Sequence, residues 1–213
     1  MMHPISRREL WQAQSALLIA IVLQFTISTH LIVGPKYLIT GLELLLVFGI
    51  GLTAPRRHST TERIHRTISI ILIALISIAN AGALVLVADA LLNGSVVPGH
   101  SLLAAAFAIF ITNIVVFSLW YWELDSPGLT GLKKHDAEPK FDFPQMESKV
   151  KEAASWEPTF TDYLYVSITN ASAFSPTDAM PLTHAAKALM SAQSIISLLT
   201  VILVTARAVN ILG

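Results

Sequence analysis

A chain of 213 residues that is 54% hydrophobic and only 13% charged, with a mean hydropathy of +0.63, cannot be a soluble globular domain and belongs with multi-pass membrane proteins. The absence of cysteine excludes disulfides, thiolate nucleophiles and cysteine-based metal or iron–sulfur sites. The 14 basic and 14 acidic residues cancel, so the position of the charges is more informative than their sum. We expect no cofactor, no metal and no nucleic-acid partner.

The first two apolar runs predict a hairpin of two transmembrane helices. Residues 15–33 follow Arg7 and Arg8, as in a signal sequence, but they contain no small-x-small cleavage motif and are long enough to span a bilayer. Gly34 and Pro35 end this run, and residues 37–54 form the second span.

Residues 67–92 and 101–121 predict the third and fourth spans. The basic segment 55–66 precedes the third and is interpreted as a solvated loop, and a glycine- and proline-containing turn separates the two spans. Trp120, Tyr121 and Trp122 close the fourth span, as expected of an aromatic belt at the headgroups. Residues 125–157 are rich in charge and proline, and they predict a soluble linker without a core of its own.

The rest of the chain is organised around residues 158–182, which read PTFTDYLYVSITNASAFSPTDAMPL. Pro158 is followed by about fourteen residues that can form a helix, and Pro176 and Pro181 then forbid its continuation. The fifth span follows at residues 183–209. This order predicts a re-entrant pore loop, since non-helical backbone at membrane depth must be buried in protein or line a cavity. The alternative is an interfacial helix leading into a turn.

The sequence therefore predicts an all-α integral membrane protein with five transmembrane helices and a re-entrant half-helix before the last one. We divide it into a four-helix region (1–122), a cytoplasmic linker (123–157) and a pore-loop-like unit (158–213). The positive-inside rule places the N-terminus in the cytoplasm and the C-terminus outside a cell membrane. Twelve of the fourteen basic residues are then cytoplasmic: Arg7, Arg8, Arg56, Arg57, Arg63, Arg66, Lys133, Lys134, Lys140, Lys149, Lys151 and Lys187.

The stretch that begins TDYLYVSITNASAFSPTDAMPL and runs to the end of the last span resembles the C-terminal part of an uncharacterised bacterial family of small multi-pass membrane proteins. It also resembles the pore helix, filter and inner helix of two-helix potassium-channel domains. Tyr165, Ser167, Asp178, Pro181 and Thr183 fall where that pattern requires them. This second resemblance covers about fifty residues. It implies a pore-loop and filter-like segment made of Ser172, Ala173, Phe174, Ser175, Pro176, Thr177 and Asp178.

The filter-like segment departs from the potassium-channel pattern. A potassium filter needs two glycines so that successive carbonyls point inward, and residues 173–177 contain none. Pro176 has a fixed φ and no N–H group, which rules out that carbonyl ladder. The expected topology is also inverted. Potassium selectivity therefore does not follow from the resemblance.

Four charged or titratable residues fall in or near the predicted spans: Glu43, His30, Asp89 and Arg207. A carboxylate at membrane depth is costly, so Glu43 is a candidate functional residue. One interpretation is a proton or cation relay of Glu43, His30 and Asp89. The other, which we favour, is an ion pair of Arg207 with Asp89 or Glu43 that holds helices in register.

The remaining polar residues in the spans predict structure and not catalysis. Asn80, Asn113 and Gln193 are single polar side chains in apolar helices and predict interhelical hydrogen bonds. Ser175, Asp178 and His184 are residue types of a catalytic triad, but they lie within ten positions of one another without a nucleophile elbow. We expect no enzyme.

Two functions remain open from the sequence. The first is a channel-like or transport protein, a cation pathway if it conducts, in which a homo-oligomer, a tetramer if a pore forms, gathers re-entrant loops around an axis in the lipid bilayer. A monovalent cation is then the possible substrate. The alternative is a structural or accessory membrane protein with a sealed loop.

Overall fold

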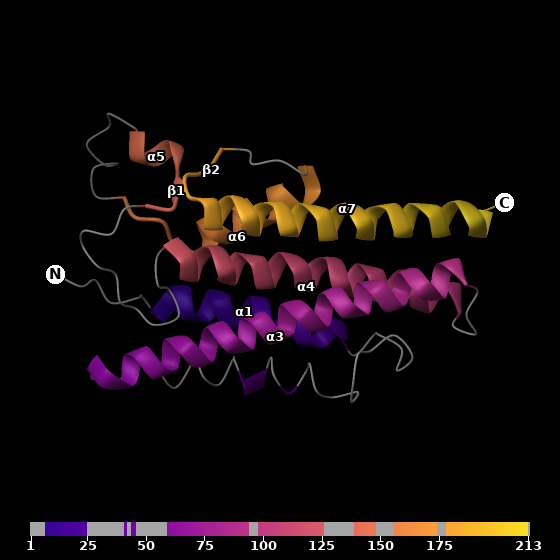
Figure 1. Cartoon of the computed structure of the whole chain (residues 1–213), viewed down its shortest axis with the longest axis horizontal. Helices are drawn as coiled ribbons and strands as arrows, with labels where there is room; N and C mark the ends of the chain where they lie inside the picture. Colours follow the sequence, from indigo (N-terminus) through magenta and orange to yellow (C-terminus); the bar gives the residue numbers. More distant parts are fainter. Residues whose placement is uncertain are drawn as a thin grey trace.

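The structure is a computed structural model, and it describes residues 7–24, 41, 44–45, 59–93, 98–125, 139–147, 156–173 and 178–212. Its elements are α1 (Arg7–Gln24), α3 (Ser59–Leu92), α4 (Gly99–Asp125), β1 (Phe141–Asp142), α5 (Pro144–Glu147), α6 (Phe160–Ala173), β2 (Met180–Pro181) and α7 (His184–Leu212) (Figure 1). The long helices lie roughly side by side and make one elongated bundle.

Three of the described helices are long and apolar enough to cross a membrane, in agreement with a membrane protein. They are Ile70–Leu92, Gly99–Asp125 and His184–Arg207, and they correspond to the third, fourth and fifth spans expected from the sequence. The expected first span continues beyond α1 into residues outside the described ranges, and α1 is not among the three candidates. Of the expected second span only Gly41, Leu44 and Leu45 are described, and all three are helical.

Helix α4 forms the centre of the bundle. It packs against α1, α3, α6 and α7, and it is more deeply buried than either of the other two candidate spans. Its sequence is apolar on all sides, as expected for a helix surrounded by others. Small residues, among them Ala105 and Ala106, are buried in its contact with α3 and let the two backbones approach closely.

The prediction of a loop before the third span is wrong for residues 59–66, eight of its twelve residues. Helix α3 begins at Ser59 and continues through the basic segment into the apolar run. The sequence from Ser59 to Glu62 has the S-x-x-E spacing of a helix start, which the charge of the segment obscured. His65 is therefore a helical residue.

Two of the three residues expected to form an aromatic belt are not on the surface of the protein. Tyr121 and Trp122 are buried in its core. Trp120 is half-buried, and its Nε1 donates a hydrogen bond of 3.0 Å to Ser77 Oγ on α3. These side chains hold helices together because other elements cover the end of α4.

Two short strands, β1 and β2, are an exception to the all-α prediction. They lie near the end of α4. Strand β1 pairs antiparallel with β2, with Phe141 opposite Pro181 and Asp142 opposite Met180. The pairing continues in a hydrogen bond of 2.9 Å from the Leu182 amide to the Lys140 carbonyl. The chain therefore leaves this end as α6 and has returned to it by β2 (Figure 1).

Candidate functional site

The candidate site is built on α6, whose length agrees with the half-helix expected after Pro158. Thr159 precedes the helix, and Asp162 in its first turn accepts hydrogen bonds from the Thr159 amide (2.7 Å) and hydroxyl (2.8 Å). The bond from the Thr159 amide is one half of a capping box, with aspartate in place of glutamate, while the Asp162 amide donates to the Thr159 carbonyl at 3.0 Å. The sequence thus fixes where α6 begins.

Helix α6 is too short to cross a bilayer. Its 14 residues span about 21 Å, whereas the hydrocarbon core is about 30 Å thick. It lies beside the first half of α7, and its contacts reach Ser194, roughly 15 Å along α7 from His184 (Figure 1). The length of α6 is thus that of a half-helix and not of a span.

Asp125, the last residue of α4, fastens the start of α6 and β1 to the bundle. One carboxylate oxygen accepts a hydrogen bond of 2.7 Å from the Tyr163 hydroxyl, and the other accepts one from the Lys140 amide. Burial, and then the neighbouring Asp125 carboxylate, raise the pKa of Tyr163 well above its ordinary value. The phenol therefore stays protonated and donates.

Aromatic rings fill the space between these elements. Phe141 packs against Tyr121 with ring centroids 5.3 Å apart and against Tyr163 at 6.2 Å, while Phe160 meets Trp122 edge-on at 5.2 Å. Phe143 contacts Tyr163 and Trp156. The linker, which has no core of its own, thus contributes Phe141 and Phe143 to the main core of the bundle.

Behind α6 lies a buried hydrogen-bond network centred on Gln193 of α7. The Gln193 amide nitrogen donates to the Ser167 carbonyl (2.9 Å) and hydroxyl (2.7 Å), and its oxygen accepts from Asn170 (2.9 Å) and from the Tyr121 hydroxyl. Ser167 donates in turn to the Ile114 carbonyl of α4 at 2.6 Å. One side chain thus connects α4, α6 and α7, all in surroundings where an unpaired polar group is costly.

Asn170 extends this network toward the surface. Its amide nitrogen also donates to the Met190 carbonyl (3.0 Å) and lies 3.3 Å from the Tyr121 hydroxyl, while its oxygen accepts from Ser194 (3.1 Å). Sequence analysis did not single out Asn170 or the role of Ser167 here. Their spacing of three on one helix was a signal, because residues i and i+3 share a face.

The expected role of isolated polar residues in the spans is confirmed. Asn80 donates to the Ile109 carbonyl of α4 at 3.2 Å, and Asn113 donates to Ser197 Oγ at 2.9 Å and to the Gln193 carbonyl at 3.3 Å. All of these bonds connect different helices. They stabilise the helix packing.

The filter-like residues are described only in part. Ser172 and Ala173 lie exposed at the end of α6, Asp178 is exposed before β2, and Phe174, Ser175, Pro176 and Thr177 lie outside the described residues. The Tyr165 hydroxyl lies 3.4 Å from an Asp178 carboxylate oxygen. The α7 N-cap is Thr183 and not Asp178, because Thr183 Oγ1 accepts from the Ala186 amide at 3.3 Å.

Of the four charged or titratable residues expected in or near the spans, the two that the structure describes, Asp89 and Arg207, do not pair with each other. Glu43 and His30 lie outside the described residues. Asp89 accepts a hydrogen bond of 2.6 Å from Asn93, and within the described ranges no ion pair joins it to Arg207. The Arg207 guanidinium packs instead on the α4 backbone at Gly99, where an added Cβ would lie 2.6 Å from Nη2. Its Nε is buried without a partner.

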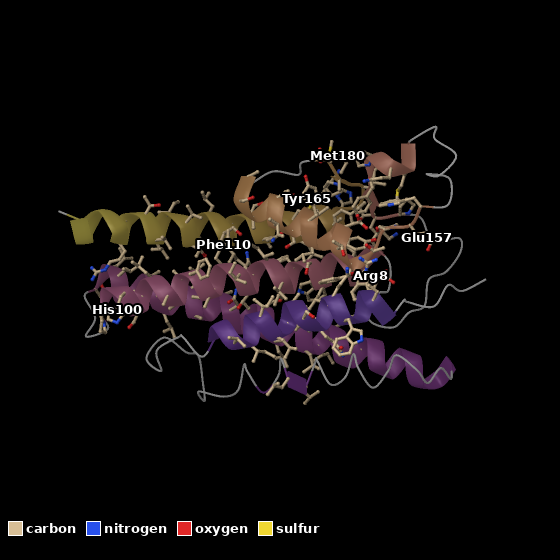
Figure 2. The ribbon with its side chains drawn as sticks, turned by 180° about the vertical axis from the view of Figure 1, so that it is seen from behind. Arg8, His100, Phe110, Glu157, Tyr165 and Met180 are labelled. Carbon is tan, nitrogen blue, oxygen red and sulfur yellow. The ribbon has the colours of Figure 1, made fainter. Side chains whose placement is uncertain are left out.

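A pocket of about 350 Å³ opens between α6, β2 and α7. Its lining combines polar and apolar residues: Asn170, Pro181, Lys187, Met190, Ser191, Ser194 and Ile195. Asn170 links the pocket to the buried network. Figure 2 labels Tyr165 and Met180, from α6 and β2, and shows them far from His100 at the start of α4.

Comparison with known proteins gives no family for this chain. No protein-family model, no curated protein and no solved structure matches it. The resemblance to pore-loop domains and to a bacterial membrane family therefore stays a prediction from the residues themselves.

Proposed function

We propose that this protein is a multi-pass protein of the cell membrane in which α6 and the segment after it form a re-entrant, pore-loop-like element of a homo-oligomeric cation pathway. The observation that carries the proposal is the course of the chain. Helix α6 starts beside Asp125, ends halfway along α7, and the chain is back at its starting end at β2. A segment that enters and leaves by one side is what a pore loop requires.

The inner face of α6 determines where such a pathway would run. Ser167 and Asn170 are buried and bonded to α4 and α7, so the described part of one copy offers no path behind α6. Tyr165, Ser172 and Asp178 are exposed on the other side. The pathway we propose therefore lies between copies, and a tetramer would surround it with four such faces.

Hydrogen bonds on the outer face of α6 favour the second candidate, a structural or accessory protein whose loop is sealed. Hydroxyl groups on the outer face of α6 bond to their own helix: Ser172 donates to the Ile168 carbonyl at 2.8 Å, and Thr169 donates to the Tyr165 carbonyl at 3.0 Å. Such side chains need neither water nor an ion. A monomer in detergent that passes no ion would select this candidate.

The charge of Asp178 provides the test of conduction. We expect Asp178→Asn to lower cation conductance in liposomes severalfold at about 10 mM salt and little at about 1 M, because the Debye length falls from about 30 Å to about 3 Å. The matched control is Asp142→Asn, which removes an acid on β1 at the same end of the bundle. Pro176→Ala should leave charge selectivity unchanged. Wild-type protein that carries no ion at any voltage or pH would exclude the pathway.

The orientation that we propose, with the N-terminus in the cytoplasm, has its own test. The chain has no cysteine, so single cysteines report accessibility without background. Ser59→Cys and Ser148→Cys should resist an impermeant thiol reagent in intact cells, and Ser95→Cys should react. Reaction at position 148 but not at position 59 would contradict the five-span topology.

A further inference from the structure

The pocket between α6, β2 and α7 contains a cationic side chain that no described residue pairs with. Lys187 lines the pocket and is exposed, and within the described part of the chain no carboxylate pairs with it. Lys187 also falls in the first turn of the candidate span His184–Arg207. The pocket therefore begins where α7 would enter the bilayer.

Two hydroxyl groups continue from Lys187 along one side of α7. Ser191 and Ser194 follow at four and seven residues, which places all three on one helical face, one turn and two turns apart. Ser194 donates to Asn170, whereas the Ser191 hydroxyl makes no hydrogen bond within the described residues. An ammonium group and a free hydroxyl thus face the same 350 Å³ space.

The electrostatic field at this end of α7 favours an anion. The first turn of α7 contains no acidic residue, so the positive end of the helix dipole adds to the Lys187 charge. A lysine in the first turn of a helix is repelled by that dipole. A negatively charged ligand would relieve this repulsion, since anions are stabilised at helix N-termini.

The apolar part of the lining indicates what kind of molecule bears the anionic group. Pro181, Met190 and Ile195 also line the pocket, and Ile195 lies about 12 Å along the helix from Lys187. Ile195 is 59% exposed at a depth where a spanning helix meets acyl chains. Ligand pockets have volumes of about 300 to 1,000 Å³, so this one suits a headgroup and not a whole lipid.

We propose that this pocket binds the phosphate headgroup of an acidic phospholipid, with Lys187 and Ser191 on the phosphate and the first acyl carbons along Met190 and Ile195. The site does not depend on conduction, because it needs only the packing of α6 and β2 on α7 in a bilayer. It gives the protein a preference for an acidic leaflet at the end where α6 begins. Through Ser194 and Asn170 the lipid would also stabilise the α6–α7 contact.

The test uses the full-length protein in a neutral detergent and follows its thermal unfolding midpoint during titration with phosphatidylglycerol, phosphatidylcholine or inorganic phosphate. Phosphatidylglycerol should raise the midpoint saturably, and the other two should not. Lys187→Gln should raise the half-saturating concentration roughly fivefold, the effect of one basic residue near an anionic surface. Arg8→Gln, which removes an exposed charge at the same end of the bundle, is the matched control (Figure 2).

A second variant distinguishes the effect of the pocket's shape from the effect of the Lys187 charge. Ser191→Phe fills the mouth and keeps Lys187, so it should abolish the saturable response. Equal effects of Lys187→Gln and Arg8→Gln would reduce the response to general surface charge and overturn the proposal. Equal stabilisation by phosphatidylcholine, or by inorganic phosphate in a Lys187-dependent manner, would also overturn it, the latter in favour of a free-anion site.

Discussion

Phe141→Ala is expected to cost about 3 to 5 kcal/mol of stability, the largest effect of any single substitution considered for this protein. The Phe141 ring is fully buried and touches both Tyr121 of α4 and Tyr163 of α6. Its loss leaves a cavity at the junction of α4, β1 and α6, where these rings meet. The measurement is the free energy of unfolding of the detergent-solubilised protein by denaturant titration.

The reactivity of a cysteine placed in α6 shows whether loss of the Phe141 ring loosens the packing of that helix. Ala171→Cys introduces the only thiol at a buried position of that helix, and it should react slowly in an otherwise wild-type chain and faster with Phe141→Ala. The control is Phe107→Ala, which removes the same ring from an exposed position of α4. Comparable losses of stability from both substitutions would mean that Phe141 does not hold α6 in place.

The sequence was sufficient to predict α6 because its signals are local. Pro158 and the Thr159–Asp162 capping pair set its start, and the prolines at 176 and 181 set a limit on its end. The polar residues Asn80, Asn113 and Gln193 were equally readable, since a lone polar group in an apolar helix must find a partner on another helix.

What the sequence could not predict depends on contacts between distant residues. Phe141 lies in a segment whose charge and proline content indicate a linker, and nothing local shows that it pairs with Pro181 and packs on Tyr121. Tyr121 and Trp122 fit an aromatic belt equally well until α6 and β1 cover them. The pocket was also not predictable, because Lys187 and Asn170 meet only when α6 lies along α7.

Arg207 shows the limit of pairing charges by sequence position. An ion pair with Asp89 was reasonable because both residues fall near the same ends of their helices. In the structure Asp89 is bonded by its own i+4 neighbour Asn93, and Arg207 packs on Gly99, the residue that leaves room for it. The partners of Asp89 and Arg207 are thus determined by a local hydrogen bond and by the room beside Gly99, and not by their opposite charges.

Gln193→Leu is expected to cost about 2 to 4 kcal/mol, because the apolar side chain leaves the buried Tyr121 hydroxyl without its acceptor and removes one partner each from Ser167 and Asn170. An unsatisfied buried polar group costs about 1 to 3 kcal/mol, whereas single interhelical hydrogen bonds in membranes average about 0.6 kcal/mol. The one-bond control is Ser197→Ala, which removes the hydrogen bond from Asn113 to Ser197 and leaves Asn113 bonded to the Gln193 carbonyl. Unfolding free energies of both variants give the comparison.

A double-mutant cycle then shows whether Gln193 and Asn170 act as one unit. If the network holds α6 against α7, Gln193→Ala and Asn170→Ala together should cost less than the sum of the two single losses, with a coupling of about 1 to 2 kcal/mol. The Ala171→Cys reporter should react faster in each single variant. Additive losses, with Gln193→Leu costing no more than Ser197→Ala, would show that apolar packing and not the network fixes the half-helix.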